Sequence, residues 1–220
     1  METDGQKDFT QTVPEAEAPD RIEENSGDPR IRPVTQLAEL CDYEATHTQQ
    51  VTRLALRLFD ELQFLHQMGA KERFWLQAGS LLHDIGWIEG GRSHQKTSMR
   101  IILTTPMLPF SNKERLIIGS IARYHRKSLP KLKHDNYAAL TPDERRQTAV
   151  LASFLRLANG LDSDHSGLIQ DLKCQVTNDE IMITALAQQS PEPLLLIAAL
   201  KCDLLKKVFN RKIELIWEQS

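Results

Sequence analysis

The sequence has little of what marks several classes of protein. It contains only three cysteines, and none of them stands in a CxxC or zinc-finger spacing, so neither a disulfide framework nor a thiolate zinc site is predicted. No apolar run approaches the length of a membrane-spanning helix, and the first residues lack the cationic and apolar segments of a signal peptide. We therefore expect a cytoplasmic protein that does not associate with membranes.

Acidic charge is concentrated near the N-terminus. Residues 1–33 contain nine acidic and four basic side chains and hardly any large apolar ones, whereas the rest of the chain contains 21 acidic and 23 basic side chains. The first segment is therefore predicted to be a disordered acidic tail, and residues 34–220 a single folded domain. The nearly neutral balance of that domain gives no electrostatic reason to bind DNA.

Hydrophobic residues recur at steps of three and four along most of the folded part, which predicts amphipathic helices. Two of them open with capping boxes, one from Ser111 to Glu114 and one from Thr141 to Glu144. The other predicted helices span about 43–69, 71–84, 94–104 and 193–209.

The hydrophobic period changes from that of a helix to that of a strand after about residue 170. Apolar residues alternate in 172–176, 181–185 and 213–217, which predicts a hairpin and a last strand. The predicted fold class is therefore mainly α, a helical bundle with a small C-terminal antiparallel β-sheet at about 170–218.

Polar groups stand at the end of, or in line with, four of the apolar helix faces. They are His47, the pair His83-Asp84, His125 and Asp162. Buried imidazole and carboxylate groups need partners, and one divalent cation can satisfy several of them at once. Taken singly, each is more typical of a hydrogen-bonded core residue, but the ordered set on separate helices favours a metal site.

The order His47, His83-Asp84, Asp162 resembles the HD superfamily of metal-dependent phosphohydrolases. The segments LLHDIG, RYHRK and LRLANGLD are similar, more narrowly, to the helical C-terminal domain of the exopolyphosphatase and guanosine pentaphosphatase family, over about residues 35–218. The resemblance implies an HD-type helical domain in which His47, His83, Asp84 and Asp162 are ligands of one divalent metal ion, which can be Mn, Fe, Co, Ni, Zn or Mg.

Some members of the superfamily bind a second metal ion through additional histidines, for which His125 and His94 are the candidates here. Where related domains commonly have His-His-Lys-His-Ser, this chain reads His94-Gln95-Lys96-Thr97-Ser98, so that Thr97 replaces a histidine near a ligand position. That departure argues against a second ion.

Cationic side chains flank these histidines. Arg126 and Lys127 directly follow His125, and Lys96 lies two residues after His94. Because negative charge on a transferring phosphoryl group calls for cations nearby, Arg126, Lys127 and Lys96 are the predicted substrate contacts. A solvated loop is the alternative interpretation of these charges.

The resemblance implies a divalent-metal-dependent phosphohydrolase acting on a nucleotide, polyphosphate or another small phosphorylated compound. In that chemistry Asp84 is the catalytic carboxylate, which orients the attacking water or bridges two ions. The sequence leaves the oligomeric state open, with a homodimer among the options.

Two alternatives stay open. In the resembled family this domain follows a catalytic portion with an actin-like ATPase fold, which these 220 residues do not contain. The chain is then a non-catalytic regulatory module that binds phosphate, polyphosphate or nucleotide, related to the exopolyphosphatase C-terminal domain. In the second alternative the metal ion is purely structural and ties the helices together.

Overall fold

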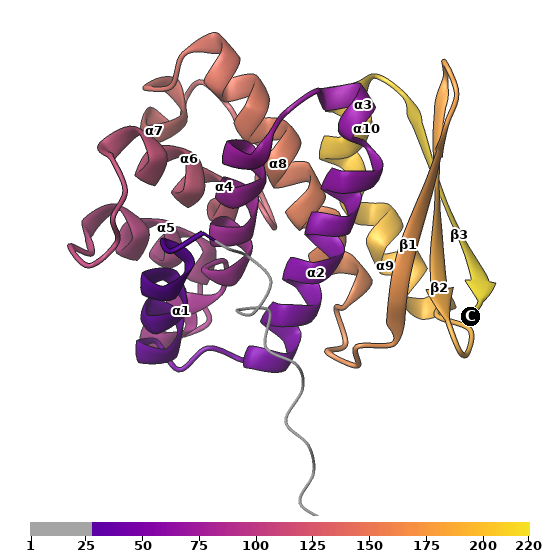
Figure 1. Cartoon of the computed structure of the whole chain (residues 1–220), viewed down its shortest axis with the longest axis horizontal. Coiled ribbons are helices and arrows are strands. Elements are labelled where there is room, and N and C mark those ends of the chain that lie inside the picture. Colours follow the sequence, from indigo (N-terminus) through magenta and orange to yellow (C-terminus); the bar gives the residue numbers. More distant parts are fainter. Residues whose placement is uncertain (1–27) are drawn as a thin grey trace, which may run out of the picture.

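The computed structural model describes residues 28–220, and these form a helical bundle with a three-stranded sheet at one end (Figure 1). This arrangement confirms the predicted fold class of a mainly helical domain with a small β appendage. The elements of the bundle, in chain order, are α1 (Ile31–Leu40), α2 (Ala45–Glu61), α3 (Gln63–His66), α4 (Ala70–Leu81), the 3₁₀ helix η2 (Ile85–Glu89), α5 (His94–Thr104), α6 (Asn112–Arg123), α7 (Asp135–Ala138) and α8 (Pro142–Leu161).

Local sequence signals set where several helices begin. At the start of α6, the hydroxyl of Ser111 accepts from the backbone N–H of Glu114, and the Glu114 carboxylate accepts from the N–H of Ser111. Thr141 and Glu144 form the same reciprocal pair at the start of α8. Both predicted capping boxes are confirmed, and each satisfies donors that the first helical turn leaves unpaired.

Two predicted helices are interrupted or shorter than expected. The helix predicted over 43–69 ends at Glu61, and after α3 the chain turns at Gln67, whose φ of 53° lies in the left-handed region. The helix predicted over 71–84 ends at Leu81. His83 and Asp84 consequently lie in the turn beyond the helix, where two adjacent residues can face the same point.

Helix α8 is the central element of the molecule. Its side chains at Leu151, Leu155, Leu157 and Ala158 are completely buried. It packs against α2, α4 and α6 on the bundle side and against the C-terminal helices on the other, and Figure 1 shows it running through the middle of the structure. The C-terminal end of α8 therefore lies where the bundle and the appendage meet.

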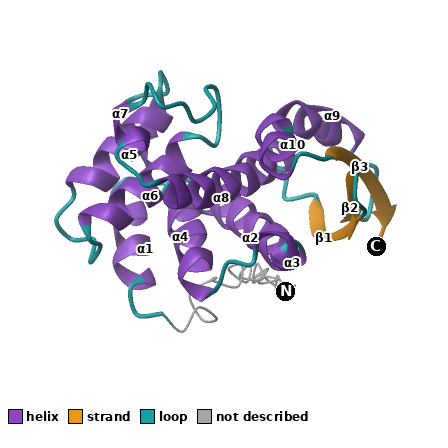
Figure 2. Cartoon of the chain, turned by 90° about the horizontal axis from the view of Figure 1, so that it is seen from above, coloured by secondary structure: helices purple, strands orange, loops and turns teal. Residues whose placement is uncertain are grey.

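The C-terminal appendage contains β1 (Ile169–Val176), β2 (Glu180–Ala187), α9 (Glu192–Lys201), α10 (Asp203–Phe209) and β3 (Lys212–Gln219). Strands β1 and β2 form the predicted antiparallel hairpin, but β3 pairs with β2 in parallel. The prediction of a purely antiparallel sheet is wrong in this respect. The two helices carry the chain back across the sheet before β3 begins (Figure 2), and such a crossover connects parallel strands.

Side chains of α2 take the place of a further strand along the free edge of β1. Arg53 donates to the carbonyl of Gln170, and Arg57 donates to the carbonyl of Leu172 at 3.0 Å. The carboxylate of Glu61 accepts from the backbone N–H of Cys174 at 2.8 Å. The appendage is thus attached to α2 through the backbone of its first strand.

The folded domain begins earlier than predicted. Most of the predicted tail, residues 1–27, lies outside the described residues. The boundary predicted after residue 33 falls inside α1, and Arg30 forms an ion pair with Glu114 at 3.1 Å and lies over the ring of Phe74. These contacts place the end of the predicted tail in the folded domain.

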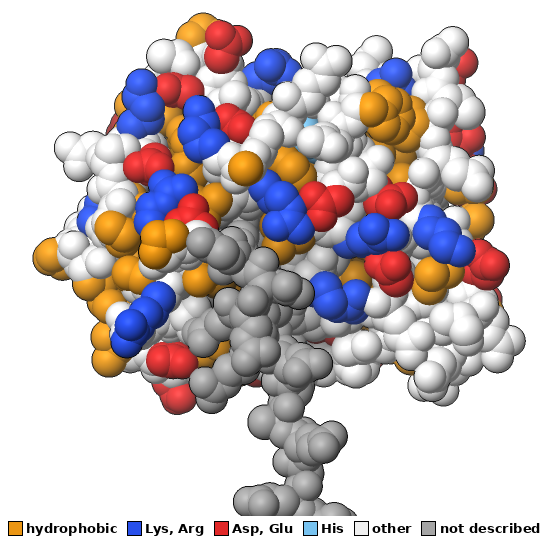
Figure 3. All heavy atoms as spheres, viewed as in Figure 1, with side chains coloured by type: hydrophobic (Ala, Val, Ile, Leu, Met, Phe, Trp, Pro, Cys, Tyr) orange, Lys and Arg blue, Asp and Glu red, His pale blue; other side chains and the backbone are white. Residues whose placement is uncertain are grey.

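The surface carries charges of both signs. In Figure 3, basic and acidic side chains are interspersed over the face shown, which agrees with the nearly neutral sequence balance. Within residues 28–220, no helix combines the length and the apolar character needed to cross a bilayer.

Candidate metal centre

Five of the six predicted metal ligands converge at the junction of four helices. His47 comes from α2, His94 is the first residue of α5, and His125 lies just beyond α6, whereas His83 and Asp84 occupy the turn after α4. Within the described residues, their ligand atoms form two groups that could hold a metal ion, and both groups include Asp84. One group adds His47 and His83, and the other adds His94 and His125.

Every histidine of the two groups is anchored through its Nδ1 atom. His83 Nδ1 lies 2.7 Å from the carbonyl of Ser80, and His125 Nδ1 lies 2.6 Å from the carbonyl of Ala122. The corresponding acceptors are a carboxylate oxygen of Asp162 for His47 at 2.7 Å and the carbonyl of Gly91 for His94 at 3.3 Å. Because these oxygens can only accept, Nδ1 carries the proton, and the neutral ring presents a bare Nε2.

The bare Nε2 atoms surround the carboxylate of Asp84. Asp84 Oδ1 lies 3.1 Å from Nε2 of His94 and 3.5 Å from Nε2 of His125. Its other oxygen lies 3.5 Å from Nε2 of His83. Ligands that share an ion lie about 2.1 Å from it and roughly 3–4 Å from one another. The spacing of these atoms is therefore that of a coordination shell.

In the half of the site containing His94 and His125, the guanidinium of Arg126 donates to Nε2 of His94, but no donor from residues 28–220 reaches the carboxylate oxygen between the two rings. The two Nε2 atoms are 3.4 Å apart, yet both present lone pairs. Asp84 Oδ1 is buried and has no hydrogen-bond donor within the described residues. Two imidazole lone pairs and a carboxylate oxygen facing one another repel unless a cation lies among them. The donor set therefore fits a divalent metal ion.

Asp162, predicted as a fourth ligand, lies against Nδ1 of His47. Its Oδ2 atom accepts from His47 Nδ1 at 2.7 Å, and its Oδ1 atom accepts from the N–H of Gly167 at 2.8 Å. It belongs to neither group of ligand atoms. A carboxylate in this position fixes the orientation and tautomer of a metal-binding histidine.

Gly86 and Ser98 hold the turn that carries His83 and Asp84. A Cβ atom at Gly86 would lie 2.2 Å from the carbonyl oxygen of His94 and 2.7 Å from the amide nitrogen of Ser98. The Ser98 hydroxyl donates to the carbonyl of His83 at 2.7 Å and accepts from the N–H of Gly86 at 2.9 Å. Gly86 therefore allows the turn to touch the start of α5, where His94 stands.

The burial of the site governs the protonation of its groups. Burial lowers the pKa of His83 and lowers that of His125 well below 6.5, so both rings are neutral at neutral pH. Burial opposes a charge on Asp84, whereas positive charge on the rings of His83, His125 and His94 would favour it, and on balance the pKa of this carboxyl is lowered. Neutral imidazoles and an ionised carboxylate are the protonation states required of metal ligands.

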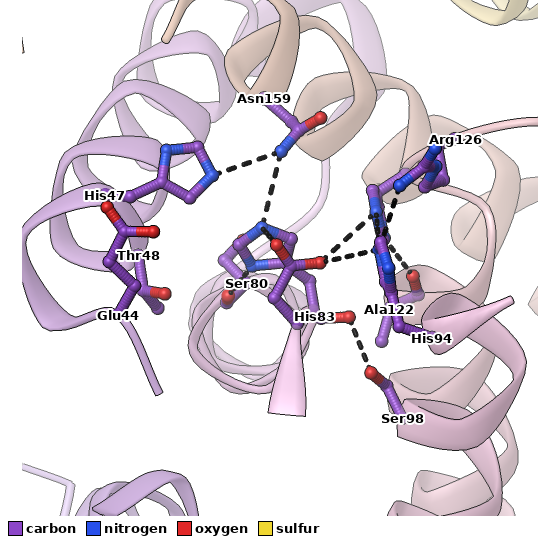
Figure 4. A network of polar contacts seen from close by, with 12 residues as sticks. Glu44, His47, Thr48, Ser80, His83, His94, Ser98, Ala122, Arg126 and Asn159 are labelled. Carbon is purple, nitrogen blue, oxygen red and sulfur yellow. Dashed lines mark hydrogen bonds and ion pairs between the residues drawn. The ribbon is translucent and has the colours of Figure 1, made fainter. Parts of the chain in front are cut away.

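A cavity of about 590 Å³ opens over this cluster of histidines and Asp84. Of the three predicted substrate contacts, Arg126 lines it, and its guanidinium donates to Nε2 of His94 at 3.3 Å. Lys127 and Lys96 are exposed and do not line the cavity. In Figure 4, His47 lies on one side of the site, and His94 and Arg126 lie on the other.

Several residues of the cavity were not predicted from the sequence. Asn159 donates from its side-chain amide to Nε2 of His47 at 3.3 Å and to Nε2 of His83 at 3.4 Å. Its position three residues before Asp162, one helical turn, is a signal that could have identified it. Glu44, His165 and Lys201 also line the cavity, and no periodicity or motif in the sequence marks them.

Comparison with known proteins identifies a family. Residues 30–207 match the family model described as Ppx/GppA phosphatase, domain III. No curated protein matches the chain. The matched residues run from just before α1 into α10 and cover most of the chain. The chain therefore belongs to the Ppx/GppA phosphatase domain III family.

Proposed function

We propose that this chain is a divalent-metal-dependent phosphohydrolase of the HD type that acts on a nucleotide, polyphosphate or another small phosphorylated compound. The observation that carries the proposal is the set of four histidines anchored through Nδ1, with bare Nε2 atoms turned toward the region of Asp84. Asn159 and Arg126 donate to three of these nitrogen atoms, but Asp84 Oδ1 has no hydrogen-bond donor within the described residues. The family relationship supports phosphate chemistry.

The chain's own residues divide the work of such a site. Asp84 would hold a divalent cation together with His47 and His83, or together with His94 and His125, and a bound cation would supply Lewis acidity that lowers the pKa of water and polarises a phosphoryl oxygen. The carboxylate of Asp84, shared by both groups of ligand atoms, orients the attacking water. Its depressed pKa keeps it an acceptor throughout the physiological range.

Arg126 supplies positive charge where the phosphate must lie. Its guanidinium contacts His94 at the rim of the cluster and lines the cavity. Such a cation stabilises the charge on a transferring phosphoryl group more strongly in a partly desolvated cavity than in water. The half-buried position of Arg126 therefore suits it to orient the phosphate.

A non-catalytic binding module is the second candidate. The family match is to domain III, a domain that accompanies the catalytic portion in this family. A regulatory module needs a cavity and cations but has no need for a complete set of metal ligands. The two candidate functions therefore differ in whether the metal ligands are needed for hydrolysis.

The first experiment measures metal content by mass spectrometry on protein purified without chelator, together with phosphate release from a panel of nucleotides, sugar phosphates and polyphosphates. Wild type is compared with Asp84→Ala and His83→Ala, and His134→Ala, which lies outside the cluster, is the matched control. We expect stoichiometric metal and phosphate release in wild type and in the control, and neither in the two cluster variants. Tight phosphate binding with metal but no release would establish the binding module instead.

A further inference from the structure

Lys201 reaches the metal cavity from the C-terminal appendage. Its helix, α9, crosses α8 at Gly160, where a Cβ atom would lie 2.9 Å from Lys201 Cγ and 3.0 Å from Ala198 Cα. Any larger residue at this position would push α9 away. The close approach places the stem of Lys201 against α8, and the residue lines the cavity together with Arg126.

Lys201 and Arg126 form the cationic side of the cavity. Arg156, nearby, is paired with Asp203 through contacts of 2.7 and 2.9 Å. Within residues 28–220, by contrast, no ion pair joins Lys201 or Arg126 to a carboxylate. Burial lowers the pKa of Lys201, and the charges of Arg156 and Arg126 lower it further, against a smaller opposing effect of Asp203. An anion bound in this corner would relieve that repulsion.

The opposite side of the cavity is acidic. Asp42 and Glu44 line it, and Figure 4 shows Glu44 beside His47, across the site from Arg126. The Glu44 carboxylate accepts from Nδ1 of His165 at 2.8 Å, and the His165 ring stacks on that of His47 with centroids 3.8 Å apart. Carboxylates in this position accept hydrogen bonds from hydroxyl groups and repel anions.

We propose that Lys201 and Arg126 bind the phosphate of the substrate, and that Asp42 and Glu44 receive a neutral remainder that carries hydroxyl groups. The substrate class is then a phosphomonoester such as a sugar phosphate or nucleoside monophosphate, and not a polyphosphate chain. A cavity of about 590 Å³ suits a ligand of that size. A second or third phosphate would meet the acidic side. This inference rests on the proposed function only in taking the bound phosphomonoester to be hydrolysed.

The test measures binding of ribose 5-phosphate by calorimetry to the full chain at fixed salt, both metal-loaded and after chelation. We expect Lys201→Ala to bind it about tenfold to a hundredfold more weakly in both states. Lys201→Arg should retain most of the affinity. Lys207→Ala removes an exposed lysine of α10, outside the cavity, and should bind as wild type does. Equal affinity of Lys201→Ala and wild type would overturn the subsite.

A second arm tests the acidic side with tripolyphosphate, used on chelated protein because this probe itself binds divalent metals. Wild type should bind ribose 5-phosphate more tightly than tripolyphosphate, and Glu44→Gln should strengthen tripolyphosphate binding at least about threefold. Tighter binding of tripolyphosphate by wild type would overturn the substrate class. Absence of metal or of phosphate release, with the Lys201 effect intact, would refute the hydrolase and leave the phosphate subsite standing.

Discussion

The two halves of the candidate metal site share Asp84 but differ in which hydrogen-bond donors reach their lone pairs. Beside His47 and His83, the amide of Asn159 donates to both Nε2 atoms. Beside His94 and His125, the Nε2 atoms are 3.4 Å apart, and the donor within the described residues is the charged guanidinium of Arg126. A neutral donor serves the first half, whereas positive charge serves the second.

This difference indicates which half depends more on a metal ion. A hydrogen bond from an amide offsets much of the cost of burying two nitrogen atoms. No such donor reaches Asp84 Oδ1, which is buried and unpaired within the described residues. We therefore expect the half with His94 and His125 to bind metal first, although the sequence resemblance puts the first ion at His47 and His83.

Removal of the shared ligand has the largest expected effect. Asp84→Asn keeps the shape of the side chain but removes the charge that both groups of ligand atoms use. Metal content should fall to background in both halves, and phosphate release should fall about a thousandfold. Mass spectrometry and a phosphate assay check this prediction. Retention of a full complement of metal by Asp84→Asn would show that the two halves do not share this ligand.

Removal of one histidine from each half tests the order in which the two halves bind metal. Under limiting metal, His125→Gln should weaken the tightest binding step by more than about 100-fold, because the loss of a direct ligand exceeds the 10–100-fold typical of its outer partners. His47→Gln should change that step much less. Competition with a chelating dye measures both. A larger effect in His47→Gln would reverse the order of the two halves.

Substitution of Asp162 is expected to have a smaller effect on metal affinity, confined to the half with His47 and His83. Asp162→Asn leaves His47 without its carboxylate partner and should weaken metal binding beside His47 and His83 by about 10–100-fold. Binding beside His94 and His125 should be unaffected. Titration of metal into the variant, followed by calorimetry, separates the two steps. Loss of metal from both halves would instead indicate that Asp162 acts as a direct ligand.

The smallest predicted effect is on the stability of the metal-free protein in mild acid. The pKa of His125 in the folded state lies well below its ordinary value of 6.5, chiefly through burial, and that of His83 is lowered too. Below pH 6.5 the unfolded chain therefore binds protons that the folded chain does not. As the pH is lowered below 6.5, the free energy of unfolding should fall by up to about 1.4 kcal/mol per pH unit for each histidine.

Urea unfolding in EDTA between pH 7.5 and 5.5 measures this dependence. His125→Asn removes one of the two neutral rings and should have a shallower slope than wild type. A free energy of unfolding that stays constant over this interval would show that the rings are not held neutral by the fold.

The sequence predicted the fold better than it predicted the environment of the site. Capping residues and hydrophobic periodicity act locally, so the starts of α5, α6 and α8 were predicted well. The position of Asp162 behind His47 depends on how α2 and α8 pack together, which no local pattern specifies. The position of Lys201 is harder still to predict, because it depends on the close contact between α9 and Gly160.

The contact between α2 and β1 has a consequence for solubility. An exposed strand edge offers unpaired carbonyl and N–H groups to any other strand, and native proteins protect such edges from aggregation. Here Arg53 and Arg57 donate to the edge carbonyls of Gln170 and Leu172. The carboxylate of Glu61 accepts from the edge N–H of Cys174. Substitutions of these three charged residues would therefore be expected to promote self-association before they affect any chemistry.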